Sequence, residues 1–73
     1  MRRFKVILEW DAEEKVFTVT VPALQGCVTY GRTRDEALER AQEAITVTLE
    51  GLEATGQPVP KGDVEVTIAE VTI

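Results

Sequence analysis

The sequence has 73 residues and a single cysteine, which leaves room for one domain, residues 1–73, and for no intrachain disulfide. It contains no histidine, serine or asparagine, which excludes Ser–His and Cys–His nucleophilic pairs, imidazole bases and histidine-based zinc sites. The formal net charge of −5 disfavours binding to a phosphate backbone and would attract a basic partner instead.

The first third of the chain predicts an antiparallel hairpin. Apolar residues alternate largely with polar ones from Phe4 to Trp10, which is the period of a half-buried strand. A polar break at residues 11–14 separates this stretch from a second alternating run, residues 16–21. Two such runs joined by a short polar turn favour pairing with each other. Pro22 has no amide hydrogen to donate and should therefore end the second strand.

A short strand and a long helix are predicted next. Residues 27–30 are β-prone and lie between two glycines, which indicates the third strand. Thr33 and Glu36 fit a capping box in which the threonine is the N-cap. Apolar residues then recur on one helical stripe, so that the helix should run roughly from 34 to 55. Gly56 and the two prolines after it should end the helix.

The last ten residues predict a fourth strand. Val64, Val66 and Ile68 alternate with other residues, but the phase slips at Ala69-Glu70. A bulge there would restore the inward direction, and fraying of the final residues is an equal alternative. The resulting fold class is α+β, a two-layer βββαβ arrangement with one helix packed on a sheet of about four strands. With the last strand beside the first, the order is 3-2-1-4, and strands 1 and 4 are parallel.

Two surfaces are candidates for contact with another protein. One is a second row on the helix, beside the apolar stripe, where a mid-helix glycine would allow close approach; an underused shoulder of the stripe is the alternative. The other is the sheet face away from the helix, which is β-branched and mixed in charge. The contact residues predicted are Arg40, Ala44, Val47 and Gly51 on the helix and Thr18, Thr20, Glu65 and Thr67 on the sheet. The last strand would also be an edge with few charges, so we expect a homodimer or higher oligomer that covers it.

The residues capable of chemistry have simpler structural explanations. Cys27 has no histidine to activate it and is better explained as a small buried residue beside a turn. Glu39, Glu43 and Glu50 share a helix face opposite the apolar stripe, where carboxylates meet water instead of converging on a metal. The glycines match no phosphate-binding motif. The sequence thus predicts no catalytic residue, no metal site, no cofactor and no enzymatic activity.

A turn of the type Pro-x-Leu-x-Gly-Cys, a Gly-x-Thr step and an acidic Glu-Ala helix start follow one another in the middle of the chain. The motif residues are Pro22, Leu24, Gly26, Cys27, Gly31 and Thr33, with Glu36 and Ala37 after them. Their order and spacing resemble the HicB-like antitoxin family, and the resemblance spans nearly the whole chain. Ala23 and Arg32 stand where members of that family often carry Asp.

The resemblance implies a partial RNase H-like βββαβ domain that binds and neutralises a small basic HicA-type mRNA interferase. Longer members add a C-terminal DNA-binding segment; we expect a short form without it, and therefore no direct binding of nucleic acid. Two alternatives stay open: a stand-alone oligomeric structural or regulatory module without a toxin partner, and a vestigial metal-dependent nuclease. A cytoplasmic location with no membrane contact is expected, because no apolar run is long enough for a membrane span or a leader.

Overall fold

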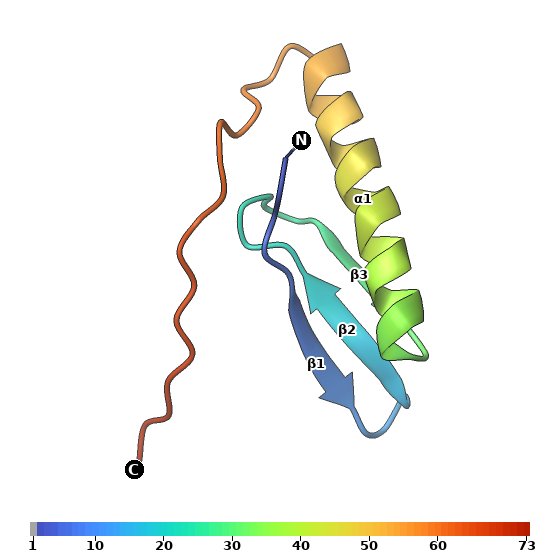
Figure 1. The fold of residues 1–73 in the computed structure, drawn as a ribbon, viewed down its shortest axis with the longest axis vertical. Helices are drawn as coiled ribbons and strands as arrows, with labels where there is room; N and C mark the ends of the chain where they lie inside the picture. Colours follow the sequence, from blue (N-terminus) through green and yellow to red (C-terminus); the bar gives the residue numbers. More distant parts are fainter. Residues whose placement is uncertain (1) are drawn as a thin grey trace.

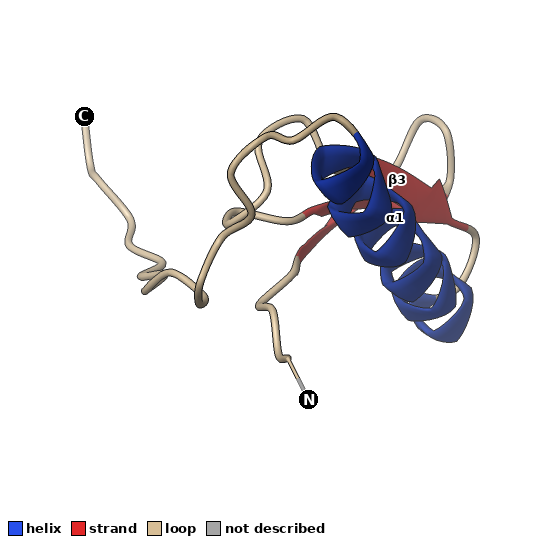
Figure 2. Cartoon of the chain, turned by 90° about the horizontal axis from the view of Figure 1, so that it is seen from above, coloured by secondary structure: helices blue, strands red, loops and turns tan. Residues whose placement is uncertain are grey.

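The computed structural model describes residues 2–73 as an open three-stranded sheet with one helix on one face. The strands are β1 (Ile7–Asp11), β2 (Val16–Thr20) and β3 (Val28–Gly31), and the helix is α1 (Arg34–Ala54). All neighbouring strands are antiparallel, in the order β1-β2-β3. Figure 1 shows the helix beside β3, and Figure 2 shows that it occupies one face of the sheet. The predicted α+β class, the hairpin, the third strand and the helix are confirmed.

A carboxylate organises the turn between β1 and β2. The Asp11 Oδ1 atom accepts hydrogen bonds from the backbone N–H groups of Glu13 (3.0 Å) and Glu14 (3.1 Å). The Asp11 carbonyl also accepts one from the Lys15 N–H, at 2.7 Å. Lys15 has a φ of 57°, in the left-handed region that residues other than glycine rarely adopt. The turn is therefore closed by side-chain and backbone bonds from Asp11, not by a glycine.

The core lies between the sheet and the helix, where small helix residues allow a close approach. Val19 in β2 is fully buried against Ala37 and Ala41 of α1. Gly31, the last residue of β3, is also buried, and a Cβ atom built on it would lie 2.6 Å from the Ala37 Cα. Only glycine fits this contact between the strand end and the first helical turn, which brings β3 under the helix.

Both ends of the helix are capped close to the predicted positions. The Thr33 hydroxyl oxygen accepts a hydrogen bond from the Glu36 N–H at 3.1 Å, so Thr33 is the N-cap. The Glu36 carboxylate accepts the return bond from the Arg32 N–H at 3.2 Å, one residue earlier than in a standard capping box. At the other end Gly56, with a φ of 72°, takes the left-handed conformation that ends the helix after residue 54.

The C-terminal segment differs from the prediction. Residues 64–73, here called the C-terminal arm, form no strand, and within residues 2–73 nothing pairs with the outer edge of β1. The expected fourth strand and the order 3-2-1-4 are therefore not observed. In Figure 1 the arm runs in the same direction as β1 but apart from it, and in Figure 2 its end lies away from both layers. The hydrogen bonds that hold this segment to the N-terminal stretch join Lys5 to Asp63 and Val64, and within residues 2–73 no ladder of backbone bonds continues from them along β1.

The root of the arm is anchored to Lys5, two residues before β1 begins. The Lys5 backbone N–H donates to Asp63 Oδ2 at 2.7 Å, and the Lys5 ammonium lies 3.3 Å from the same oxygen. The ammonium also donates to the Val64 carbonyl at 3.1 Å. Loss of water raises the pKa of Asp63, but bonds from the backbone of Val64 and Lys5 and from the Lys5 ammonium outweigh it and hold the pKa below 3.8.

Candidate protein-binding site

Within residues 2–73 no strand pairs with the outer edge of β3, and this edge lies beside the helix. Between them is a shallow groove of about 380 Å³. Its strand side is formed by residues 26–29, and its helix side includes Arg40, Ala44 and Val47. Three residues of the predicted helix row are thus brought together with an unpaired strand edge. Such an edge presents backbone N–H and C=O groups that can pair with a strand of another protein.

Three large apolar side chains are exposed along this edge. The exposed fractions are 56% for Val28, 59% for Tyr30 and 68% for Val47. Single exposed apolar residues are ordinary in proteins, but a contiguous group around a free strand edge is typical of an interaction surface. Tyrosine in particular is enriched at the centres of interfaces. These residues, together with Arg40, Ala44 and Thr18, are called the β3-edge surface from here on.

Arg40 connects the helix side of this surface to the strand. Its Nε atom lies 3.5 Å from Glu36 Oε1, one turn earlier on the helix. Its guanidinium carbon lies 5.9 Å from the centroid of the Tyr30 ring, within the range of a cation–π contact. The contacts with Glu36 and Tyr30 limit the motion of the Arg40 side chain, which lines the groove. Its guanidinium has further N–H groups that can donate hydrogen bonds to an acceptor on a partner.

Past the edge of β3, the exposed surface continues onto the face of the sheet that points away from the helix. A second hollow of about 430 Å³ is lined there by Val16, Thr18, Val28 and Tyr30, with Asp11 and Glu14 at its rim. The strand register explains this grouping, because Thr18 pairs with Tyr30 and Thr20 pairs with Val28 on the same face. The two surfaces predicted from the sequence therefore meet along β3.

Three of the predicted contact residues lie elsewhere. Glu65 and Thr67 belong to the C-terminal arm and do not share a sheet face with Thr18 and Thr20 as expected, since the fourth strand is not formed. Gly51 lies on the helix beyond Val47, does not line the groove, and has open space around the position of a Cβ atom. It is exposed to solvent.

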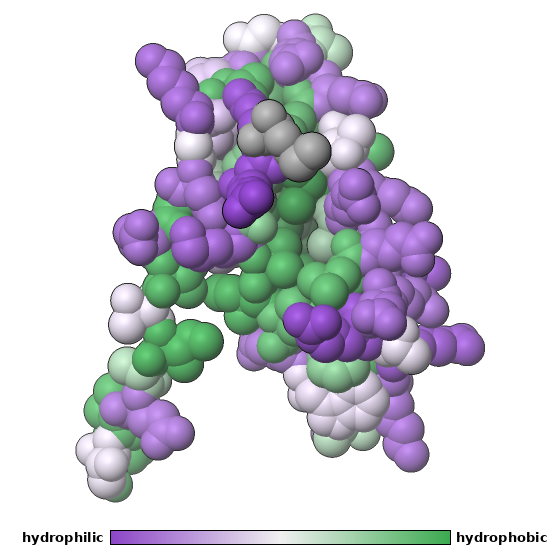
Figure 3. Space-filling model, viewed as in Figure 1, coloured by the Kyte–Doolittle hydropathy of each residue, from purple (hydrophilic) through white to green (hydrophobic). Residues whose placement is uncertain are grey.

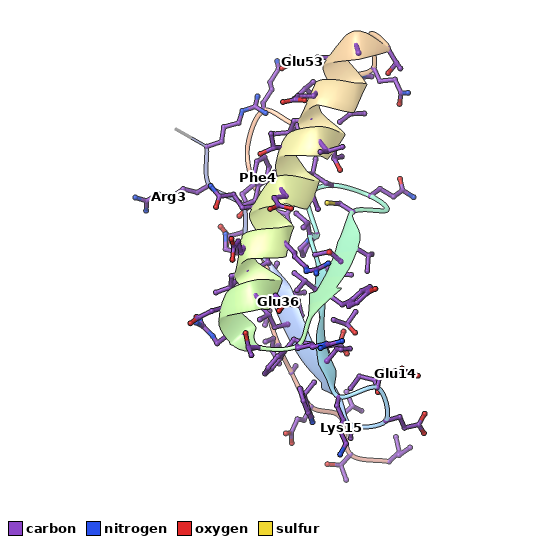
Figure 4. The ribbon with its side chains drawn as sticks, turned by 90° about the vertical axis from the view of Figure 1, so that its right-hand side faces the viewer. Arg3, Phe4, Glu14, Lys15, Glu36 and Glu53 are labelled. Carbon is purple, nitrogen blue, oxygen red and sulfur yellow. The ribbon has the colours of Figure 1, made fainter. Side chains whose placement is uncertain are left out.

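The helix places negatively charged side chains next to this surface. α1 carries six carboxylates against two arginines, and Glu39, Glu43, Glu50 and Glu53 are exposed. Figure 4 shows Glu36 and Glu53 near opposite ends of the helix, so that the charge is distributed along its length. Glu43 lines the groove itself. A basic partner would be attracted to this surface over a distance of about a Debye length, roughly 8–10 Å.

The turn motif after the hairpin has a structural role in positioning the β3 edge. Leu24 and Cys27 are buried with Val21, and the Val21 N–H donates to the Cys27 carbonyl at 3.1 Å. Gly26 has a φ of 79°, which explains the glycine at this position. The Thr48 hydroxyl on the helix donates to the Cys27 Sγ at 3.6 Å, so the thiol is enclosed between turn and helix.

The structure adds residues that the sequence analysis did not single out. Val28 and Tyr30 were predicted only as part of a short strand, and their exposure on a free edge makes them the centre of the surface. The available signal was their alternation with Thr29, which places both side chains on the same face of the strand. Among residues 2–73 no cluster of three or more metal-ligating side chains is found. None of the helices in this range is long and apolar enough to cross a membrane.

Comparison with known proteins gives one matching family and several similar proteins. The sequence profile of the family described as HicB-like antitoxin of bacterial toxin–antitoxin systems matches residues 4–71. A UPF0150 protein of Thermoplasma acidophilum is 37% identical over 71 residues, which cover 97% of this chain and 96% of the relative. A UPF0150 protein of Archaeoglobus fulgidus is 42% identical over 48 residues, 66% of this chain and 68% of the relative. No solved structure shows significant similarity.

Proposed function

Because the chain belongs to the family of HicB-like antitoxins of bacterial toxin–antitoxin systems, we propose that it binds and neutralises a small basic protein toxin of the HicA mRNA-interferase type. Neutralisation here means occlusion: the antitoxin covers the toxin surface that would otherwise contact RNA. Such a surface is basic because it must bind phosphates. An acidic binding module is therefore the complementary partner.

The observation that carries the proposal is the β3-edge surface. Exposed Val28, Tyr30 and Val47 supply apolar area around a free strand edge, while Glu43 and Asp11 supply negative charge at its margins. This is the usual layout of a protein interface, with an apolar centre and a polar rim. A partner strand added beside β3 would gain main-chain hydrogen bonds, and its side chains would enter the hollows on the two faces.

The proposal requires no catalytic group. The chain lacks the histidine and serine on which most nucleophilic and acid–base mechanisms depend. The carboxylates on α1 are distributed along an exposed face and suit charge attraction better than metal binding. The net charge of −5 disfavours nucleic acid as a direct partner. The cytoplasm, where mRNA is available to such a toxin, is the location that fits this role.

The test is to establish whether a small basic protein is encoded beside this chain and to co-express the two. We expect co-expression to restore growth that the basic protein alone arrests, and we expect the two proteins to purify as a complex. If neither happens, the antitoxin role is wrong and a stand-alone module without a toxin becomes the better description.

A substitution pair locates the contact. Val47→Lys introduces a positive charge into the β3-edge surface, so it should abolish rescue and weaken the complex by at least tenfold. Gln57→Lys makes the same charge change at an exposed position beyond the helix and should leave both unchanged. Both positions are exposed, so neither substitution removes a buried contact. If the two variants bind the toxin equally well, the toxin does not bind at β3.

A further inference from the structure

The C-terminal arm exposes a series of apolar side chains. The exposed fraction is 40% for Val64, 87% for Ile68, 84% for Val71 and 115% for Ile73. None of them belongs to the buried clusters or to the residues packed against those clusters. Figure 3 shows hydrophobic residues both along the arm and on the body of the molecule beside it. An extended segment with this pattern has strand character but lacks a partner in the single chain.

At the opposite edge of the sheet, none of the residues from 2 to 73 forms a strand beside β1. In this part of the chain β1 pairs only with β2, and the helix packs more over β3 and β2 than over β1. A groove of about 390 Å³ is open there, between the N-terminal segment and the helix. Its apolar lining consists of Phe4, Val6, Leu38, Ala41, Ile45 and Leu49. Figure 4 shows Phe4 beside the middle of the helix, whereas Arg3 points away from it.

The groove has an apolar lining and an open strand edge, and the arm is an extended segment with exposed apolar side chains. A strand added beside β1 would satisfy the free backbone groups of that edge. Its inward side chains, at alternate positions such as Val66 and Ile68, would cover the apolar lining of the groove. Few of the arm residues are charged, since Glu65 and Glu70 are the only ones between Val64 and Ile73. Little charge would therefore have to be desolvated when the arm is buried.

We infer that the arm of one copy pairs with the β1 edge of a second copy, in a reciprocal exchange that forms a homodimer. The root of the arm is held beside Lys5 of its own chain through Asp63 and Val64, and the chain then diverges from its own β1. Two copies related by a two-fold axis have two arms and two open edges, so the exchange closes without leaving either unpaired.

The exchanged dimer completes each sheet with a strand from the partner. The order in each half becomes 3-2-1-4, with strand 4 supplied in trans, and the groove lined by Ile45 and Leu49 is covered. The β3-edge surface lies at the opposite edge of the sheet and stays free. The inference rests on the arm and the β1 edge, and it holds whether or not a toxin binds.

A matched pair of arm variants tests the dimer. Full-length protein should have twice the 8.1 kDa mass of one chain in light scattering after size exclusion, across micromolar to millimolar concentrations. Ile68→Asp should reduce this to the mass of one chain. Thr67→Asp, which adds the same charge on the other side of the arm, should stay dimeric. Far-UV circular dichroism should keep the helix signal in all three proteins, because both positions are exposed, and only Ile68→Asp should lose the strand signal of the exchanged arm.

An isotope-mixing experiment separates exchange between chains from closure within one chain. Equal amounts of ¹³C-labelled and unlabelled protein are unfolded and refolded together, and isotope-filtered nuclear Overhauser effects are recorded. We expect contacts between methyl groups of Ile68 in one chain and Ile45 or Val6 in the other. A monomer at every concentration, a dimer that Ile68→Asp leaves intact, loss of the dimer in both variants, or Ile68 contacts only within one chain would each overturn the inference.

Discussion

Individual residues explain how a chain of this size obtains a defined fold from a thin core. The contact between Gly31 and Ala37 lets β3 end directly under the first helical turn, and Asp11 closes the hairpin without a glycine. At the other end of the chain, Lys5 and Asp63 fix the root of the arm. Each of these contacts depends on one side chain, or on the absence of one, and each predicts a measurable change.

Substitution of Gly31 should destabilise the fold. In Gly31→Ala the new methyl group would lie 2.6 Å from the Ala37 Cα, so strand and helix must separate. We expect a loss of about 1–3 kcal/mol in the free energy of unfolding, the usual range for overpacking. Urea denaturation measures it. Gly62→Ala is the control, because nothing lies within 4 Å of the corresponding position and its stability should change little. Similar losses in both variants would contradict the account of Gly31.

The Asp63 anchor should be sensitive to acid. Its folded-state pKa lies below the ordinary value of 3.8, so the stabilisation is present above that value and is lost as the pH falls through the lowered pKa. In an NMR titration, the Asp63 carboxyl should titrate below 3.8, and the Lys5 amide resonance should move with it. Asp63→Asn should remove the pH dependence of that amide. A carboxyl that titrates at or above 3.8 would show that the anchor is not formed in solution.

At the scale of elements, the regular segments follow from local sequence and the arm does not. Thr33 and Gly56 mark the helix ends with caps that need no distant contact, and the β1–β2 hairpin follows from alternation across a short turn. The arm has an equally clear alternation at Val64, Val66 and Ile68, but whether it pairs depends on tertiary geometry. Pattern alone does not specify whether a strand joins its own sheet or another.

The helix part of the candidate surface could be predicted from the sequence, but its strand part could not. Helical spacing placed Arg40, Ala44 and Val47 in one row, and the structure adds that this row borders the free β3 edge. The contribution of Tyr30 could not be derived from spacing, because it depends on which strand forms the sheet edge. For the same reason Glu65 and Thr67 were assigned to a sheet face on which they do not lie.

The mid-helix glycine gives a prediction about the helix itself. Gly51 has helical geometry, and no atom lies within 4 Å of a Cβ built on it. Gly51→Ala should therefore raise the free energy of unfolding by about 1 kcal/mol, the difference in helix propensity. Thermal denaturation monitored by circular dichroism at 222 nm measures this change. A lower stability in the alanine variant would mean that the glycine is needed for a contact within the fold.

At the scale of the whole molecule, the two sheet edges have different chemistry and should respond differently to salt. The toxin binding proposed for the β3-edge surface would be steered by the acidic residues at its margins, so its association rate should fall as sodium chloride is added. Pairing of the apolar arm with β1 should be little affected or strengthened by salt. Stopped-flow mixing and light scattering over the same salt series compare the two. An association rate independent of salt would argue against electrostatic attraction.

The central claim is that the free edge of β3 receives a basic toxin. The most direct measurement is NMR mapping of backbone amides in the full-length protein as a basic protein that rescues growth in the co-expression test is added. The account predicts the largest changes, together with new protection from hydrogen exchange, at Val28–Gly31 and around Val47 on the helix. Changes confined to β1 and the C-terminal arm, or none at all on β3, would contradict it.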